Sequence, residues 1–441
     1  MMTMAGNHGP APKRTLSWTF PVFQADISLS SGCHFQKPTD PPLGNDPAGV
    51  LSGVLFESTA LSDEPGLERP VVWMNGEGFL MITMQSPLSN DVNDWLHFRM
   101  KKAFPVLSGD GPDSLEVIPL TGDASNRRYY RVVSKTAPLS AILMVKGKPE
   151  GFKASEEKTG RGENLPPGDP FLLIGKLLSA SSLPVPEILG ENDDGSLLLQ
   201  EDLGDWSLYS YLQEHPEEES LLSWRILDLL LSFGRQTIPG EFSWLKSRVY
   251  SEELLFWEFE HFLEYGVSLS DKSALSTIRS LFQEEASVLS GRLPLVPVHR
   301  DFHSRNIMIA GRGAVLIDFQ DMLMGSPLYD LASWVFDAYR VLPDDLLNEL
   351  VSGHYHRGIS LGILPESLSE GEHRNLLARM ALQRNLKACG RFFYIRDVKG
   401  NPGYMQAVSG THRNMKRLAL WEPSVAPLVQ SFLPFLRNPE K

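Results

Sequence analysis

The sequence is poor in cysteine and has no long apolar run. Only Cys33 and Cys389 occur among 441 residues, which excludes a disulfide scaffold and a zinc ribbon. Because so few cysteines are present, a reducing compartment is the simplest expectation, and we expect a cytoplasmic protein. No stretch of about 18 apolar residues is present, so no transmembrane helix is expected. Lys13 and Arg14 have no continuous apolar segment behind them, unlike the basic residues of a signal peptide.

Positive charge is also scarce. The chain has 41 Lys and Arg against 54 Asp and Glu, a formal net charge of −13. Because nucleic-acid binding depends on clustered Lys and Arg that neutralise phosphates, we expect no nucleic-acid partner. The apolar and charged fractions of 42% and 22% are those of a soluble globular protein, which excludes a fibrous or wholly disordered chain. At roughly 150 residues per domain, the length predicts two to three structural units.

Residues 1–80 differ from the rest because they are rich in Gly and Pro and show no sustained amphipathic period. This composition predicts a disordered or loosely attached extension. A second interpretation is that the segment is not part of the natural protein. The run Gly76-Glu77-Gly78 can be encoded by a purine-rich stretch that resembles a ribosome-binding site, so translation would begin at Met81 or Met84.

A small β-rich lobe is expected over residues 93–205. A helix is predicted over Asn93–Ala103, because apolar residues recur on one face, and three strand-like runs follow it. These runs, which predict a three-stranded meander, are Leu115–Leu120, Arg128–Val133 and Ala141–Lys146. The turn over residues 121–126 is rich in small and polar residues, so it is either an ordinary hairpin or a phosphate-binding loop.

Two further features belong to the nucleotide side of this lobe. Lys146 ends the third strand, where it either pairs with nucleotide phosphates or keeps a sheet edge soluble. The short helix predicted over Phe171–Ser179 offers no Glu to pair with Lys146, and residues 148–168 are a charged insert expected to be a flexible flap. An apolar strand over Ser196–Gln200 leads into 201–205, a linker whose backbone can face an adenine ring.

Residues 206–436 show helical periods and predict a helical lobe. The expected helices are Leu221–Phe233, Glu252–Tyr265, Ala274–Leu289, Leu328–Tyr339, Glu372–Tyr394 and Met405–Trp421. Two short strands are expected near Val296–Val298 and Ala314–Ile317. The strongest chemical signal in the chain lies between and just after these strands.

The segment His299-Arg300-Asp301-Phe302-His303-Ser304-Arg305-Asn306 matches the pattern H-R-D-x-x-x-x-N, and Asp318-Phe319 follows the second strand. Phosphoryl transfer needs an oriented hydroxyl and metal ions that neutralise phosphate charge. We therefore expect Asp301 to accept a hydrogen bond from the attacking hydroxyl as the catalytic carboxylate. Asn306 and Asp318 offer the hard oxygen ligands that Mg²⁺ prefers. A lone D-x-x-x-x-N is also found in solvated loops, but the combination of both segments is far more specific.

These motifs resemble the aminoglycoside phosphotransferase/choline kinase superfamily. His303 stands two positions after Asp301, as in those families, and the run 325–331 is also similar. Three stretches, residues 122–131, 201–205 and 383–392, resemble the cell-wall recycling kinases that phosphorylate N-acetylmuramate and N-acetylglucosamine at the anomeric hydroxyl. The resemblance implies an α+β, bilobal protein-kinase-like fold that uses ATP and Mg²⁺. The ATP-binding residues that we expect, from the turn, the end of the third strand and the linker, are Ser125, Asn126, Lys146, Glu201 and Leu203.

The substrate side of the predicted site is a set of polar residues in the helical lobe. Arg384, Lys387 and Arg391 recur at i, i+3 and i+7, so they share one helix face that is either solvated or holds a substrate carboxylate, as an acidic sugar requires. The substrate-binding residues that we expect are His303, Gln320, Asp321, Arg384 and Lys387. His303 can instead be a buried structural histidine, and His299 is expected to be a structural residue that holds the backbone.

The rival functions follow from other features of the same lobe. An acidic stripe formed by Glu252, Glu253, Glu258, Glu260 and Glu264 is either a solvated helix face or a groove for a cationic aminoglycoside. Other small alcohols are further possible acceptors. A nucleotide-binding pseudokinase scaffold is the alternative from a different class, and the intact trio Asp301, Asn306 and Asp318 argues against it. We expect a monomer.

Overall fold

The computed structural model describes residues 71–74, 80–83, 88–120, 127–147 and 166–440. Two compact units separate by their contacts. In the first, β1 (Val71–Met74) and β2 (Leu80–Thr83) pair as antiparallel strands that the sequence did not predict. The rest of residues 1–80, Met84, the turn over 121–126 and most of the charged insert lie outside the described residues. The predicted extension and gene start therefore stay predictions.

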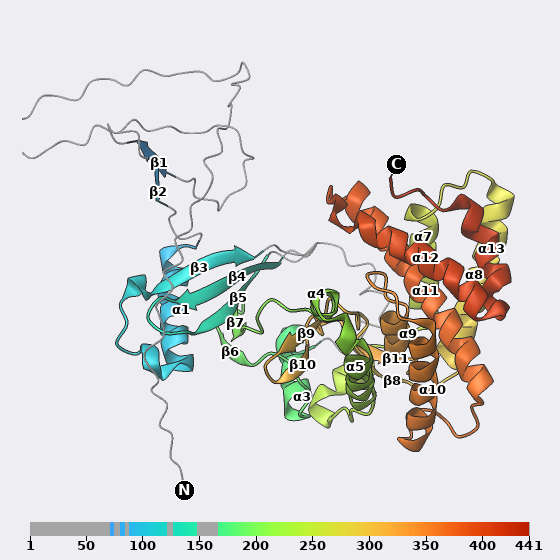
Figure 1. Cartoon of the computed structure of the whole chain (residues 1–441), viewed down its shortest axis with the longest axis horizontal. Helices are drawn as coiled ribbons and strands as arrows, with labels where there is room; N and C mark the ends of the chain where they lie inside the picture. Colours follow the sequence, from blue (N-terminus) through green and yellow to red (C-terminus); the bar gives the residue numbers. More distant parts are fainter. Residues whose placement is uncertain (1–70, 75–79, 84–87, 121–126, 148–165, 441) are drawn as a thin grey trace, which may run out of the picture. The chain divides into compact units, whose positions relative to one another are not determined.

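The β-rich lobe of the second unit is built on a five-stranded antiparallel sheet with the order β3-β4-β5-β7-β6 (Figure 1). Its strands are β3 (Leu115–Leu120), β4 (Arg127–Ser134), β5 (Ser140–Lys146), β6 (Ile188–Glu191) and β7 (Leu197–Glu201). The predicted meander is confirmed as β3-β4-β5. The helix α1 (Asn90–Ala103) contributes Leu96 and Met100 to a core shared with the sheet, because both side chains lie on its buried face.

The second lobe consists of helices and two small antiparallel sheets, β8 (Val296–Val298) with β11 (Leu323–Gly325) and β9 (Ile307–Ala310) with β10 (Gly313–Leu316). Within the range predicted for the β-rich lobe lies one more helix, α3 (Pro170–Ala180). The shorter helices of the second lobe are α4 (Leu208–Glu214), α6 (Ser243–Lys246), α9 (Tyr329–Val335) and α13 (Ala426–Phe432). The longer ones are α5 (Glu219–Gly234), α7 (Glu252–Tyr265), α8 (Lys272–Gly291), α10 (Asp344–Ser360), α11 (Glu370–Asp397) and α12 (Met405–Trp421). No helix in the described ranges is long and apolar enough to cross a membrane.

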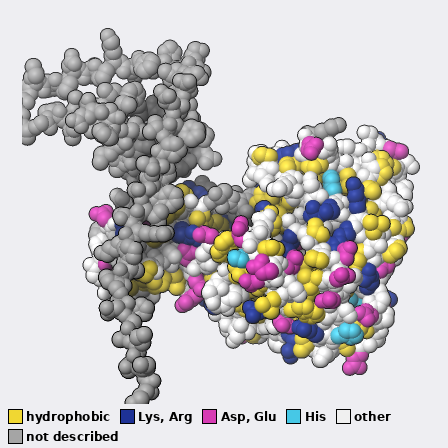
Figure 2. Space-filling model, viewed as in Figure 1, with side chains coloured by type: hydrophobic (Ala, Val, Ile, Leu, Met, Phe, Trp, Pro, Cys, Tyr) yellow, Lys and Arg dark blue, Asp and Glu magenta, His cyan; other side chains and the backbone are white. Residues whose placement is uncertain are grey.

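The long helix α11 organises this lobe, since it packs against α7, α9 and α12 (Figure 1). Two glycines allow close approaches of backbone to backbone in this lobe. A Cβ at Gly390 of α11 would lie 2.8 Å from the Phe262 backbone of α7, and one at Gly410 of α12 would lie 1.7 Å from the Ala338 carbonyl oxygen. On the face of the lobe in Figure 2, basic and acidic side chains are interspersed. Arg279 of α8 and Glu260 of α7 form an ion pair at 2.8 Å.

One predicted helix is wrong at its C-terminal end. The sequence predicts Leu328–Tyr339, but α9 ends at Val335. Asp337 uses its carboxylate instead to accept hydrogen bonds from the Ser304 and Tyr339 backbone N–H groups, at 2.9 Å each. Competition between an Asp side chain and the helical backbone ends helices in this way. The interruption brings residues 336–339 to residues 299–306, the segment predicted to be the catalytic loop.

A pair of buried histidines joins α10 to α11. His354 Nδ1 and His373 Nε2 lie 3.0 Å apart, and burial lowers the pKa of His373 to about 4 and that of His354 well below its usual value. Unfolded histidine binds a proton near pH 6.5. The unfolded state therefore binds more protons between about pH 6.5 and 4, and the free energy of unfolding falls as the pH drops through that window.

Replacing the pair should flatten this dependence. In His354→Leu/His373→Leu, we expect the loss of melting temperature between pH 7 and pH 5 to be smaller than in the wild type. His356→Gln is the matched control, because His356 is exposed on the same helix and its loss should leave the wild-type slope. Differential scanning calorimetry across that range makes the comparison. Equal slopes for the double variant and the wild type would show that the pair does not control acid stability.

Candidate active site

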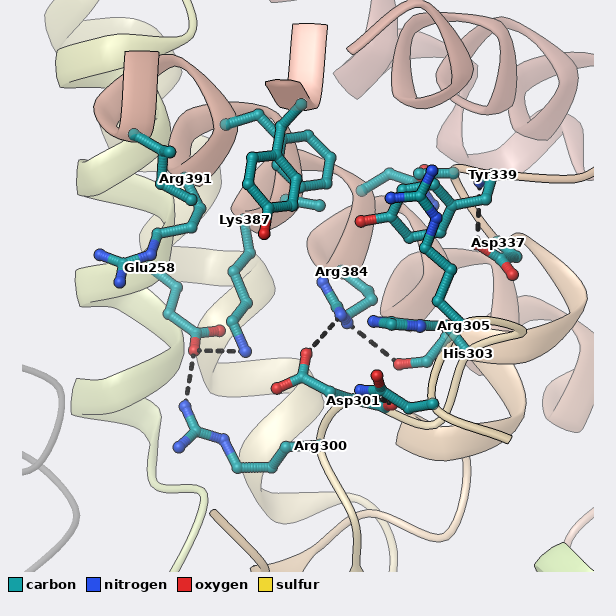
Figure 3. A pocket seen from close by; sticks show the side chains of 18 of the residues that line it. Glu258, Arg300, Asp301, His303, Arg305, Asp337, Tyr339, Arg384, Lys387 and Arg391 are labelled. Carbon is teal, nitrogen blue, oxygen red and sulfur yellow. Dashed lines mark hydrogen bonds and ion pairs between the residues drawn. The ribbon is translucent and has the colours of Figure 1, made fainter. Parts of the chain in front are cut away.

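The two predicted chemical segments lie side by side because each connects strands of the two small sheets. Residues 299–306 run from β8 to β9, and residues 317–322 run from β10 to β11. His299 Nε2 lies 3.0 Å from the Ile317 carbonyl oxygen and so links the two segments. Asp301, Asn306 and Asp318, predicted separately along the chain, therefore line one cavity of about 1110 Å³. Figure 3 shows Asp301 among other residues that line this cavity.

A buried carboxylate fixes the backbone of the catalytic loop. Asp330 accepts hydrogen bonds from the backbone N–H groups of His299 at 2.6 Å and Arg300 at 3.0 Å, which agrees with a structural role for this residue. Arg300 and Asp318 both have positive φ angles, of 77° and 62°. This backbone conformation is uncommon for residues other than glycine, because the Cβ atom crowds the backbone. Such strain persists at functional sites where the surroundings hold it.

Asp301, the predicted catalytic residue, is held by a cation from α11. Arg384 Nη2 lies 2.7 Å from Asp301 Oδ1, while Arg384 Nε donates to Ser333 Oγ at 3.0 Å (Figure 3). Burial opposes ionisation of Asp301, but the charges of Arg384 and Lys387 outweigh it and hold the Asp301 pKa well below its usual range. Asp301 is therefore ionised and oriented, as a carboxylate that accepts a hydrogen bond from a substrate hydroxyl must be.

The residues predicted to hold metal fit Mg²⁺ in their chemistry. Asn306 Nδ2 donates to the Asp301 carbonyl oxygen at 3.1 Å, which leaves the amide oxygen as the group that can bind a cation. Burial raises the pKa of Asp318 to about 6, and the carboxylates of Asp301 and Asp321 add to that effect against the hydrogen bond from Gln320. A site of crowded carboxylates with hard oxygen donors suits a divalent cation.

The predicted nucleotide residues are placed only in part. Lys146 Nζ forms an ion pair with Asp169 Oδ2 at 2.8 Å, so its acidic partner precedes α3 instead of lying within the helix. Asp169 is also the N-cap of α3, with Oδ1 accepting from the Phe171 and Leu172 N–H groups. An acidic partner was expected within the helix, and Asp169 was therefore missed. The dipeptide Asp169-Pro170, which is typical of a helix start, could have indicated it. Ser125 and Asn126 lie outside the described residues.

The linker residues predicted to face adenine are clamped by arginines. Glu201 Oε2 lies 2.7 Å from Arg312 Nη2, and its backbone N–H donates to the Glu187 carbonyl oxygen. Arg131 of β4 forms ion pairs with Asp202 at 2.8 Å and with Asp205 at 2.7 Å. Leu203 is half-buried. Its adenine-facing role and that of Glu201 stay predictions.

Four of the five predicted substrate residues line the cavity, namely His303, Asp321, Arg384 and Lys387. Gln320 is not among the lining residues. Its Nε2 donates to Asp318 Oδ1 at 2.7 Å, so the described contact of its side chain orients the predicted metal ligand. The His303 ring packs edge-on against Tyr339 with centroids 5.3 Å apart, and burial lowers its pKa.

Behind the catalytic loop lies a buried network that the sequence did not predict. Glu258 of α7 is only 1% exposed, and its Oε1 lies 3.2 Å from Lys387 Nζ and 3.3 Å from Arg300 Nη2. Gln383 donates to Glu258 Oε2 at 2.8 Å, and Tyr250 donates to the same oxygen. Glu258 lines the cavity, but it is buried and paired with two cations, so the prediction of a solvated helix face is wrong for this residue.

Comparisons with known proteins agree with this geometry. A model of the phosphotransferase enzyme family matches residues 116–360. A relative from Pseudomonas aeruginosa, named N-acetylmuramate/N-acetylglucosamine kinase, is 28% identical over 342 residues, covering 76% of this chain and 94% of its own. A relative of the same name from Neisseria meningitidis serogroup B is 30% identical over 322 residues, covering 70% and 88%.

Among solved structures, a choline kinase from Cryptosporidium parvum Iowa II matches with a TM-score of 0.50 at 12% identity, covering 76% of this chain and 96% of that one. At that identity the match shows the fold alone, and it confirms the predicted α+β, kinase-like architecture. The family model covers more than half of the chain and includes both segments that form the site. This chain therefore belongs to the phosphotransferase enzyme family.

Proposed function

We propose that this protein transfers the γ-phosphate of ATP, with Mg²⁺, to the anomeric hydroxyl of N-acetylmuramate or N-acetylglucosamine, as a cytoplasmic step of peptidoglycan recycling. The observation that carries the proposal is its likeness to the two kinases named for these sugars, over 94% and 88% of their own lengths. The site supports it, since the chain has the carboxylates and the amide that phosphoryl transfer requires.

The residues divide the work as follows. Asp301 accepts the hydrogen bond of the sugar hydroxyl, and Arg384 keeps it ionised and in place. Asp318 and Asn306 would hold Mg²⁺, which neutralises phosphate charge when bound. Lys146 and the residues around it would bind the nucleotide. His303, Asp321 and Lys387 would contact the sugar and fix its orientation.

The low basicity of Asp301 favours an anomeric acceptor. Arg384 and Lys387 hold the pKa of Asp301 well below its usual range, so it is a weak base. An anomeric hydroxyl is more acidic than an ordinary alcohol, because the ring oxygen withdraws electron density, and it asks less of its base. The residues that contact the sugar would contribute to the rate by positioning it, so that only the anomeric oxygen lies in line with the γ-phosphate.

The rival acceptor and the scaffold are less well supported. A cationic aminoglycoside would need several exposed carboxylates, but in the predicted acidic stripe Glu258 is buried and neutralised by Lys387 and Arg300. Glu264 is then the exposed carboxylate of the stripe that lines the cavity. A pseudokinase scaffold would not need Asp301, Asn306 and Asp318 in one cavity. We also propose that the protein is a monomer.

The position of the transferred phosphate tests the proposal. We expect the product to be a sugar 1-phosphate that mild acid hydrolyses, and we expect a methyl glycoside of the same sugar to give no turnover, since its anomeric oxygen is blocked. Phosphorus NMR of the product identifies the coupled proton. The free sugar with its own methyl glycoside is the matched pair. A phosphate coupled to the protons of C6, or brisk turnover of the glycoside, would refute the anomeric assignment and leave the kinase assignment standing.

A further inference from the structure

One end of the cavity has a composition that the phosphoryl-transfer residues do not explain. There α7 and α11 face each other and contribute mainly aromatic side chains. We call this the aromatic end, and it is lined by Trp257, His261, Glu264, Tyr265, Arg391 and Tyr394. The whole cavity, at about 1110 Å³, is slightly larger than the roughly 300–1000 Å³ usual for small-molecule sites. It therefore has room for a substituent beside the sugar ring.

The three cations that α11 presents to the cavity differ in how far they are neutralised. Arg384 is paired with Asp301, and Lys387 is paired with Glu258 and also donates to the Tyr329 hydroxyl at 2.9 Å. Arg391 is exposed and has no ion-pair partner among the described residues. It lies on the same side of the cavity as Lys387 and Glu258 (Figure 3), and its guanidinium carbon is 5.0 Å from the Tyr394 ring centroid.

A second polar group at the aromatic end also lacks a partner. His261 Nε2 is buried and makes no hydrogen bond within the described part of the chain. Its ring is stacked on Trp257 with centroids 5.5 Å apart and lies 4.9 Å from the Tyr265 ring. Burial lowers its pKa to about 4, and the nearby Arg391 charge adds to this. The imidazole is therefore neutral at pH 7 and can donate one hydrogen bond.

We propose that Arg391, assisted by His261, binds a carboxylate carried by the substrate, so that the aromatic end selects an acidic N-acetylated amino sugar over its neutral counterpart. This inference rests on the proposed function. N-acetylmuramate differs from N-acetylglucosamine by a lactyl ether, which has one carboxylate and one methyl group. A guanidinium offers paired donors to a carboxylate, and aromatic rings pack against the methyl group and the apolar face of the sugar.

Two other charged groups compete with this assignment. Glu264 at the same end is exposed and accepts a hydrogen bond from Tyr265, so it opposes an anion only through solvent. At the other end of the cavity, Arg305 is a second cation without an ion pair in the described ranges. Its guanidinium carbon lies 4.0 Å from the Tyr339 ring centroid and 5.3 Å from that of Tyr209. Arg305 is thus the alternative carboxylate-binding residue, and the experiment must separate the two.

The test compares both sugars in the full-length protein carrying Arg391→Gln. Loss of a hydrogen bond between charged groups should raise KM for N-acetylmuramate about 10- to 100-fold. The kcat for that sugar and both constants for N-acetylglucosamine should stay near the wild-type values, because the neutral sugar makes no contact with Arg391. Arg391→Lys should recover part of the affinity, since it keeps the charge but loses the paired donors.

Two further variants make the result decisive. Arg413→Gln removes an exposed arginine of α12 outside the cavity and should leave all four constants unchanged. Arg305→Gln tests the alternative end. A selective rise in KM for N-acetylmuramate in Arg305→Gln but not in Arg391→Gln would overturn the inference. Equal effects of Arg391→Gln on both sugars would overturn it as well. If the wild type phosphorylates neither sugar, the proposed function itself is wrong. The outcomes above that overturn the inference leave the proposed function intact.

Discussion

Replacing Asp301 by Asn should lower kcat by about 10²- to 10⁴-fold, the range typical for loss of a positioned acid–base group. The amide keeps the shape of the side chain but not its charge, so the sugar hydroxyl loses the carboxylate that orients it and draws off its proton. Nucleotide binding should persist, because Asp301 is not among the residues assigned to the nucleotide. Steady-state kinetics together with a direct measurement of nucleotide affinity would check both parts.

The same substitution affects stability, because it leaves the Arg384 guanidinium without its partner. The pair is only partly buried, with the side chains of Asp301 and Arg384 33% and 11% exposed, so breaking it should cost less than the roughly 3–5 kcal/mol of a fully buried pair. The variant must still be assayed below its own melting temperature. Arg384→Lys is a useful companion, since it retains a cation beside Asp301. Wild-type turnover in Asp301→Asn would remove Asp301 from the catalytic role. Loss of nucleotide binding and turnover together would indicate a folding defect instead.

Local patterns were sufficient for most of the secondary structure. The bounds of β3, β8, α7 and α12 were predicted to the residue, because each is a short alternating or helical period that ends at a polar or turn-forming residue. The helix α10 was missed although its start was readable. Pro343 precedes Asp344 and Asp345 in its first turn, and Arg357 lies in its last turn, which is the usual charge pattern of a helix.

The predicted site separates into what motif spacing can show and what only tertiary packing shows. Asp301 and Asn306 lie on one loop, so five residues of spacing place them together. Glu258 meets Gln383 across a separation of 125 residues, and Asp337 reaches Ser304 across 33. Nothing in the local sequence announces such contacts. For the same reason the sequence could place Arg384, Lys387 and Arg391 on one helix face, but it could not show which of them have ion-pair partners. Arg384 and Lys387 are neutralised by carboxylates from elsewhere in the chain, and Arg391 is not.

The last prediction concerns the proposed metal. Asp318→Asn should raise the Mg²⁺ concentration needed for half-maximal activity by at least about 10- to 100-fold, the loss usual when a residue that merely orients a metal ligand is removed. The reason is charge, since Asp318 provides the anionic oxygen of the pair and Asn306 provides a neutral one. Gln320 donates to Asp318 Oδ1 at 2.7 Å and can still orient the amide oxygen of the variant, so the shape of the site should be retained.

Asp321→Asn is the matched control, because it removes an equal charge from the same segment and the same cavity without removing a proposed ligand. It should change the apparent affinity for the sugar more than the Mg²⁺ requirement. Titration of activity with Mg²⁺ at saturating nucleotide distinguishes the variants. Identical Mg²⁺ curves for Asp318→Asn and the wild type would exclude Asp318 as a ligand, and equal shifts in the two variants would mean that the cavity attracts the cation only through its overall charge.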